Sequence, residues 1–286
     1  MTEGSGSSGR FVGLRQRVLT AVVLAVMLLL VLFVLPPIFT MLLIVMAVTG
    51  GAWEWSAFLH PQRRRLRLAY VLLVAFGLFV AWQYTLAPLA LSWLLGFTAV
   101  WWIIALAWVM FAPARGGAAT AAIAGLFVLV PAGIALMRLR FEDNGAALLL
   151  FALVVVMAAD VGAYFAGNRY GRTKLAPKVS PGKSWEGVIG GVGASLVVAA
   201  VGARLLGWPI APVMLLAAGA AAFSIVGDLT ESLMKRQTGL KDSGRLFPGH
   251  GGVLDRFDSL SAGVPIFVLG LLEAELISAP LRGAFE

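Results

Sequence analysis

The chain is a succession of apolar segments, each long enough to cross a lipid bilayer. A membrane-spanning helix needs about 20 consecutive apolar residues, and prolines such as Pro61, Pro88 and Pro113 separate segments of this length as turn signals. With 60% apolar and 13% charged residues, the composition excludes a soluble globular domain. We predict an all-α, polytopic integral membrane protein with about nine transmembrane helices, near residues 18–35, 38–59, 68–87, 89–112, 118–137, 146–166, 187–206, 209–229 and 259–278.

The distribution of positive charge predicts how these helices are oriented. If the spans alternate, all but four of the 22 Lys and Arg residues fall on the side of the N-terminus. Because cytoplasmic loops carry the excess of Lys and Arg, we place the N-terminus in the cytoplasm, together with the charged loops near residues 167–186 and 235–256. The net charge of +8 then reflects topology and attraction to anionic membrane lipid. We expect no nucleic-acid partner.

The domain organisation is simple. Residues 1–13 are rich in Gly and Ser, which predicts a flexible tail or a remnant of cloning. Residues 14–286 are predicted to form a single transmembrane domain that carries the two charged loops. The chain has no Cys and only two His residues, so we expect oxygen ligands for any metal ion, which favours Mg²⁺, Mn²⁺ or Ca²⁺ over zinc.

Ionisable residues gather in the segment from Ser232 to Asp258, which we call the signature segment, and at the end of the helix before it. Asp228, Glu231, Ser232 and Lys235 follow the spacing i, i+3, i+4 and i+7, which places them on one face of a helix. Their oxygens offer ligands to a hard cation, with Asp228 the deepest in the apolar helix. The alternative for Glu231 and Lys235 is a solvated ion pair at a helix end.

The middle of the signature segment has the composition of a phosphate-binding loop. Glycines let backbone N–H groups converge on an anion, and neighbouring cations add charge. His250 either contacts a phosphate or only shapes the turn. The candidate residues here are Arg236, Lys241, Asp242, Ser243, His250, Gly251 and Gly252.

The end of the signature segment carries Asp255, Arg256 and Asp258 at the start of the last predicted helix. Asp255 beside Asp228, across a pair of helices, would complete a metal site. Asp258 either contributes to the site or caps the helix, since carboxylates near a helix N-terminus complement its dipole.

The loop near residues 167–186 is the second charged region. Asp160 and Tyr164 share one face of the preceding helix, and Glu186 either caps the following helix or belongs to the site. Its cations favour lipid headgroups or a phosphate-bearing substrate, and Lys174, Ser180 and Lys183 are the candidates. In the N-terminal half, Glu54 is an intramembrane acid that we expect to pair with an arginine of the loop after it.

These motifs resemble those of the phosphatidate cytidylyltransferases, or CDP-diacylglycerol synthases. The likeness extends over almost everything after Leu14, although Asn168 and Ser184 stand where Gly and Thr are expected. The matching motifs are Ser232-x-x-Lys235-Arg236, Lys241-Asp242-Ser243-Gly244, Pro248-Gly249-His250-Gly251-Gly252, Asp255-Arg256-x-Asp258, Lys174-Leu175-x-Pro177, Ser180-Pro181-x-Lys183, Glu186-Gly187 and Trp53-Glu54-Trp55.

The resemblance implies an enzyme of phospholipid biosynthesis that converts CTP and phosphatidate to CDP-diacylglycerol and pyrophosphate with Mg²⁺, with a second cation as an option. It implies a bacterial cytoplasmic (inner) membrane, with the active site facing the cytoplasm, and leaves a homodimer open. Asp228 and Asp255 would hold the metal. The catalytic set would be Asp228, Asp255, Lys241, His250 and Arg256, and the substrate-binding set Asp160, Tyr164, Lys174, Ser180, Lys183, Glu186, Ser232, Lys235, Arg236, Asp242, Ser243, Gly251, Gly252 and Asp258.

Two other classes of membrane protein share some of these features. A transporter also carries intramembrane acids and glycine-broken helices, but its site lies near the bilayer midplane and its halves are repeats; neither is apparent here. A CDP-alcohol phosphotransferase-type enzyme would continue after Asp258 with Gly and further aspartates, whereas Ser259 follows here and no aspartate comes after it.

Overall fold

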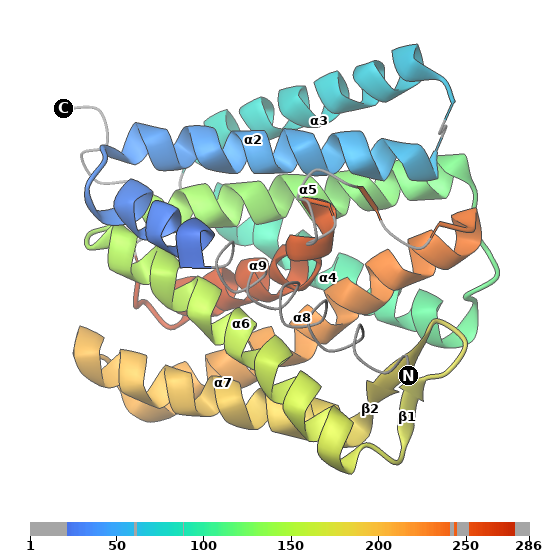
Figure 1. The fold of residues 1–286 in the computed structure, drawn as a ribbon. Helices are drawn as coiled ribbons and strands as arrows, with labels where there is room; N and C mark the ends of the chain where they lie inside the picture. The colour runs from blue at the N-terminus through green and yellow to red at the C-terminus, as the bar shows by residue number, and fades with distance from the viewer. Residues whose placement is uncertain (1–21, 60–61, 88, 241–242, 245–251, 278–286) are drawn as a thin grey trace, which may run out of the picture.

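The computed structural model describes residues 22–59, 62–87, 89–240, 243–244 and 252–277 as a bundle of helices (Figure 1). Two one-turn 3₁₀ helices, η1 (Ser56–Phe58) and η2 (Leu254–Arg256), join the longer elements. The α-helices are Val22–Phe33, α2 (Pro37–Trp55), α3 (Arg64–Tyr84), α4 (Ala90–Phe111), α5 (Ala118–Arg140), α6 (Gly145–Tyr170), α7 (Trp185–Leu206), α8 (Ile210–Thr238) and α9 (Asp258–Glu273).

The prediction of a helical protein with apolar spans is confirmed. In the described ranges, seven segments are long and apolar enough to cross a membrane, from α2 with η1 through to α8. The described part of the first helix, Val22–Phe33, is shorter, and α9 has 16 residues. Nine crossings and a cytoplasmic N-terminus therefore stay predictions.

Helix α5 forms the centre of the bundle. It packs against α2, α3 and α9 and is buried over most of its length, whereas only 22% of the apolar window of α3 and of α7 is buried. The exposed faces carry large apolar side chains such as Leu72, Phe76 and Leu215. An apolar surface of this extent suits contact with lipid rather than water.

The charged loop after α6 is a β-hairpin, which the all-α prediction missed. Strands β1 (Lys174–Ala176) and β2 (Ser180–Ser184) pair antiparallel, with Lys174 opposite Ser184 and Ala176 opposite Ser180. Strand β1 has only three residues, and the sequence S-P-G-K-S of β2 does not show the alternation of apolar and polar residues that predicts a strand. Helix α7 follows directly, because the Ser184 hydroxyl accepts the Gly187 N–H at 3.2 Å and caps the helix.

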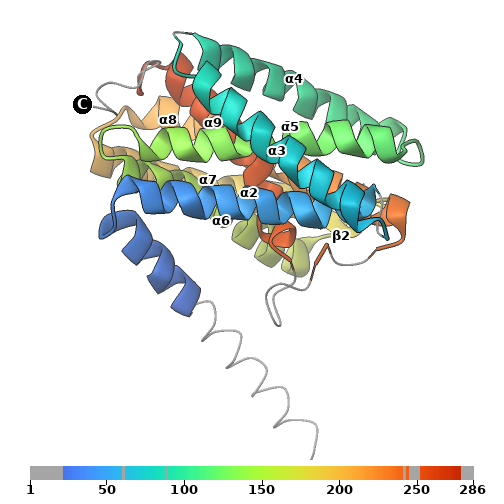
Figure 2. The ribbon, with the colours of Figure 1, turned by 90° about the horizontal axis from the view of Figure 1, so that it is seen from above.

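Several chain segments meet at one end of the bundle. The C-terminal end of α8, the hairpin, and the junction between α2 and α3 lie on the same side in both Figure 1 and Figure 2. Helix α8 ends after Thr238 because Gly239 adopts a φ of +70°, a left-handed conformation that glycine tolerates well. This end of the molecule gathers most of the predicted site residues.

Candidate active site

Asp228 joins the two charged regions of the sequence. One oxygen of its carboxylate, Oδ2, lies 2.5 Å from Lys183 Nζ of strand β2. The other, Oδ1, accepts a hydrogen bond of 3.4 Å from the Ser232 hydroxyl, one turn further along α8. The hairpin and the signature segment therefore form one site, and the helical spacing that the sequence predicts for Asp228 and Ser232 is confirmed.

Lys235 links α8 to the end of the signature segment. Its Nζ lies 2.7 Å from Glu231 Oε1 and 2.5 Å from Asp255 Oδ1. The Glu231 side chain is only 2% exposed, and those of Lys235 and Asp255 are each 16% exposed. The alternative of a solvated Glu231–Lys235 pair is wrong, because the pair is buried and is shared with a third residue.

Asp255 is held as an anion by its neighbours. Its Oδ2 accepts the backbone N–H of Gly252 at 2.8 Å, and its Oδ1 contacts Lys235. Burial alone would raise the pKa of Asp255, but the hydrogen bonds from Lys235 and Gly252 outweigh it and lower that pKa below its usual value. A carboxylate that stays charged suits a site for cations.

Two further aspartates extend the acidic region. The Ser259 hydroxyl donates a hydrogen bond of 2.9 Å to Asp160 Oδ1, which connects α6 to the start of α9. Asp258 Oδ1 accepts the Ser259 N–H at 2.8 Å, a local contact in the first turn of α9. The charges of Asp228, Glu231 and Asp160 also act on Asp258. We call Asp160, Asp228, Glu231, Asp255 and Asp258 the carboxylate cluster.

Other predicted residues of the hairpin region have local contacts. Glu186 accepts the Thr173 N–H with both carboxylate oxygens, at 3.1 and 3.2 Å, and so fastens the hairpin to α7. Arg236 Nε donates to the Val179 carbonyl at 3.3 Å, which fastens the hairpin to α8. The substrate roles predicted for both stay predictions.

The remaining candidates are less constrained or lie elsewhere. Tyr164 and Lys174 are exposed, Ser180 is half-buried at the start of β2, and Arg256 is exposed beside Asp255. Ser243 is buried. Lys241, Asp242, His250 and Gly251 lie outside the described residues, as do residues 1–13 of the predicted tail.

Glu54 has a different partner from the one predicted. Its Oε2 accepts the Leu254 N–H at 2.8 Å, so it contacts the signature segment rather than an arginine of the loop that follows α2. Arg67 instead donates to the Trp53 carbonyl at 2.8 Å and to the Ser56 hydroxyl at 2.9 Å. The only sequence signal for Glu54 was an acid within an apolar helix.

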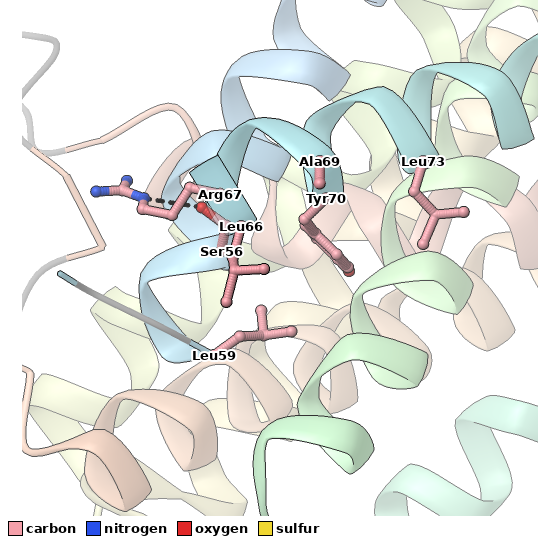
Figure 3. A pocket seen from close by; sticks show the side chains of 7 residues that line it. All are labelled: Ser56, Leu59, Leu66, Arg67, Ala69, Tyr70 and Leu73. Atoms are coloured by element: carbon pink, nitrogen blue, oxygen red, sulfur yellow. Dashed lines mark hydrogen bonds between the residues drawn. The ribbon is translucent and has the colours of Figure 1, made fainter. Parts of the chain in front are cut away.

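A small apolar cavity of about 220 Å³ lies apart from the carboxylate cluster, where η1 meets α3. Figure 3 shows Arg67 at its edge, with Nε bonded to the Ser56 hydroxyl and the terminal nitrogens pointing away from the cavity. The lining residues are Ser56, Leu59, Leu66, Arg67, Ala69, Tyr70 and Leu73.

The proposed metal ligands, Asp228 and Asp255, already bond protein donors through both oxygens. Among the described residues, no group of three or more His, Cys, Asp or Glu side chains is arranged to hold a metal ion. Mg²⁺ commonly takes only one or two carboxylates, with substrate phosphates and water as its other ligands. The donor set therefore fits Mg²⁺, provided that Lys183 and Lys235 release these oxygens.

A helical, apolar bundle with lysines and carboxylates gathered at one end has the architecture of a polytopic membrane protein with a charged site. The chain is a member of the cytidylyltransferase family, whose model matches residues 15–272. The phosphatidate cytidylyltransferase of Pseudomonas aeruginosa is 44% identical over 261 residues, which cover 89% of this chain and 95% of that protein. The phosphatidate cytidylyltransferase of Haemophilus influenzae is 40% identical over 280 residues, covering 89% of this chain and 97% of that protein. The resemblance seen in the motifs is confirmed, and a transporter is not favoured.

Proposed function

We propose that this protein transfers the cytidylyl group of CTP to phosphatidate, which gives CDP-diacylglycerol and pyrophosphate. The family match and the two full-length relatives support this reaction. The structural observation that carries it is the union of two cationic regions over one carboxylate cluster, through the Lys183–Asp228 and Lys235–Asp255 pairs.

The reaction needs electrostatic assistance more than a strong base. An oxygen of the phosphatidate phosphate attacks the α-phosphorus of CTP, the bond to the bridging oxygen breaks, and that oxygen leaves with pyrophosphate. A phosphate monoester is already ionised at neutral pH, so it needs no deprotonation. The difficulty is that two polyanions must approach each other, which cationic side chains relieve.

The cations of the site would therefore bind the phosphates of both substrates. We assign Lys235 and Arg256, with Lys241 and His250, to the triphosphate. Lys235 contacts Asp255, and Arg256 follows Asp255 in the chain. We assign the hairpin residues Lys174, Ser180 and Lys183 to the headgroup of phosphatidate. Ion pairs with the carboxylate cluster hold the side chains of Lys183 and Lys235 at the site.

Mg²⁺ is the proposed cofactor, held by Asp228 and Asp255, with a second cation as an extension of the same site. When bound, it would supply positive charge to phosphate oxygens. A bacterial inner membrane and an active site facing the cytoplasm agree with the positive-inside rule, and the homodimer stays a prediction.

The test is a transfer assay with purified protein, CTP, phosphatidate and Mg²⁺, in which release of pyrophosphate and formation of CDP-diacylglycerol are measured. We expect activity from the wild-type protein and a loss of about 100-fold or more from Asp255→Asn, because the variant loses the negative charge that would hold Mg²⁺ and that pairs with Lys235. The variant should still insert and fold. Full activity of Asp255→Asn would refute its proposed role, and an inactive wild type would refute the function.

A further inference from the structure

Glu54 is a buried carboxylate that contacts the backbone of the signature segment. It lies at the end of α2 and its side chain is shielded from solvent, with 6% of the residue exposed. Its Oε2 accepts the N–H of Leu254, a residue 200 positions later in the chain, at 2.8 Å. Leu254 begins η2, the short helix that contains Asp255.

Two glycines of the signature segment approach the same carboxylate. A Cβ atom on Gly252 would collide with both oxygens of Glu54, and a Cβ atom on Gly244 would collide with one oxygen and its carbon. The absence of a side chain at these two positions lets the backbone pass close to the carboxylate. Gly244, Gly252 and Leu254 therefore enclose Glu54 from three points of the segment.

The end of α2 that carries Glu54 is itself firmly attached. Arg67 of α3 donates to the Trp53 carbonyl, and its guanidinium carbon lies 4.0 Å from the centroid of the Trp53 ring. On the other side, Trp55 Nε1 donates to the Ala121 carbonyl of α5 at 2.8 Å. Three adjacent residues thus bind three different parts of the molecule. Trp53 binds α3, Glu54 binds the signature segment and Trp55 binds α5.

We propose that Glu54 is a positioning residue of the active site, which fixes the signature segment against α2 and so sets the place of Asp255. Gly252 connects the two carboxylates, because its backbone touches Glu54 while its N–H binds Asp255 Oδ2. Glu54 acts on the reaction only through this backbone. The effect of Glu54 on catalysis rests on the proposed function. The effect of Glu54 on the position of the signature segment is independent of that function.

A carboxylate is suited to this role because it only accepts hydrogen bonds. A glutamine at position 54 has the same shape, but its NH₂ group donates and would face the Leu254 N–H in one of its two orientations. A charged acceptor also binds an N–H group more strongly than a neutral one. We therefore expect Glu54→Gln to loosen the segment without leaving a cavity.

The position of the segment can be followed by cysteine labelling, since the chain has no cysteine. Ser243 is buried in the segment, and Ser195 is buried in α7 and bonds the Val155 carbonyl far from it. In the Glu54→Gln background, a maleimide should label Ser243→Cys about 10-fold faster or more. Loss of a hydrogen bond to a charged group lets the segment open more often and expose the cysteine. Labelling of Ser195→Cys should not change, because the bundle stays folded.

Activity gives the second measurement, made in the chain without added cysteine. Glu54→Gln should lower kcat for cytidylyl transfer on the order of 100-fold, the effect of a catalytic group misplaced by about 1 Å, with a smaller change in the KM for phosphatidate. Glu273→Gln is the matched control, because Glu273 is exposed at the end of α9, and it should leave both measurements unchanged.

Three outcomes would overturn the proposal. One is unchanged labelling of Ser243→Cys in the Glu54→Gln background, and the second is equal acceleration at Ser195→Cys, which would indicate general unfolding. The third is a wild-type kcat in Glu54→Gln although Ser243→Cys is labelled faster, because the segment would then move without affecting catalysis. If Glu54→Gln does not accumulate in the membrane, Gly252→Ala displaces the carboxylate from the other side and must give the same pattern of labelling. A wild-type protein without transfer activity would refute the proposed function alone.

Discussion

Replacing Lys235 by methionine should destabilise the protein far more than the same replacement of Lys183. Methionine keeps most of the length and apolar surface of lysine but removes its charge. Lys235 is the shared counterion of Glu231 and Asp255, and Glu231 is almost completely buried. Its loss leaves two carboxylates facing each other without a cation between them.

The magnitudes follow from burial. Removing one partner from a buried ion pair costs about 3–5 kcal/mol, and the partial exposure of Lys235 and Asp255 places the loss at the lower end, at about 3 kcal/mol. Lys183 and Asp228 are more exposed, at 23% and 32%, so Lys183→Met should cost about 1 kcal/mol or less. At roughly 2–4 °C per kcal/mol, Lys235→Met lowers the Tm by about 6–12 °C and Lys183→Met by about 4 °C or less.

The assay is thermal unfolding in detergent at a fixed scan rate, with both variants and the wild type side by side. Adding Glu231→Gln to Lys235→Met removes one of the two unpaired charges, so the double variant should recover part of the loss. Equal shifts for the two lysine variants would refute the argument from burial. A double variant less stable than Lys235→Met would refute the shared-counterion arrangement.

The remaining predictions concern orientation, packing and metal. A cysteine at Ser180 should be labelled by a membrane-impermeant reagent only from the cytoplasm, and a cysteine at Leu205, at the other end of α7, only from outside. The measurement compares intact cells with inverted vesicles, and the reverse pattern would overturn the predicted orientation. Gly227→Ala should destabilise the protein by about 1–3 kcal/mol, because its Cβ would collide with the Asp258 carbonyl between α8 and α9; an unchanged Tm would show that the helices separate easily. Chelation of Mg²⁺ should abolish transfer and readdition should restore it, whereas activity retained in excess chelator would exclude the metal from the reaction.

Features governed by local periodicity were predictable from the sequence. The apolar segments gave the starts of the helices within a few residues, as for α4, predicted over 89–112 and observed at Ala90–Phe111. Helix α8 was predicted over 209–229 but continues to Thr238, because its last turns are polar and carry no apolar signal. The shared face of Asp228, Glu231 and Lys235 follows from 3.6 residues per turn, and their contacts confirm it.

Features that depend on tertiary packing were not predictable. The Glu54–Leu254 bond joins residues 200 positions apart, and an isolated acid in an apolar helix does not indicate its partner. Burial excludes the alternative of a solvated Glu231–Lys235 pair, which spacing alone left open because it cannot separate a surface pair from a buried one. The hairpin has one strand of three residues and one whose sequence does not alternate between apolar and polar residues.

The length of α8 would give the two substrates different routes to the site if the helix crosses the bilayer. With 29 residues the helix is about 43 Å long, close to the full thickness of a bilayer with its headgroups. Asp228 lies ten residues before Thr238, so it is about 15 Å from the end of the helix. If α8 crosses the bilayer over its full length, Asp228 is recessed below the membrane surface. A lipid would reach it sideways from its own leaflet, while a soluble nucleotide would have to descend along α8 from the aqueous side.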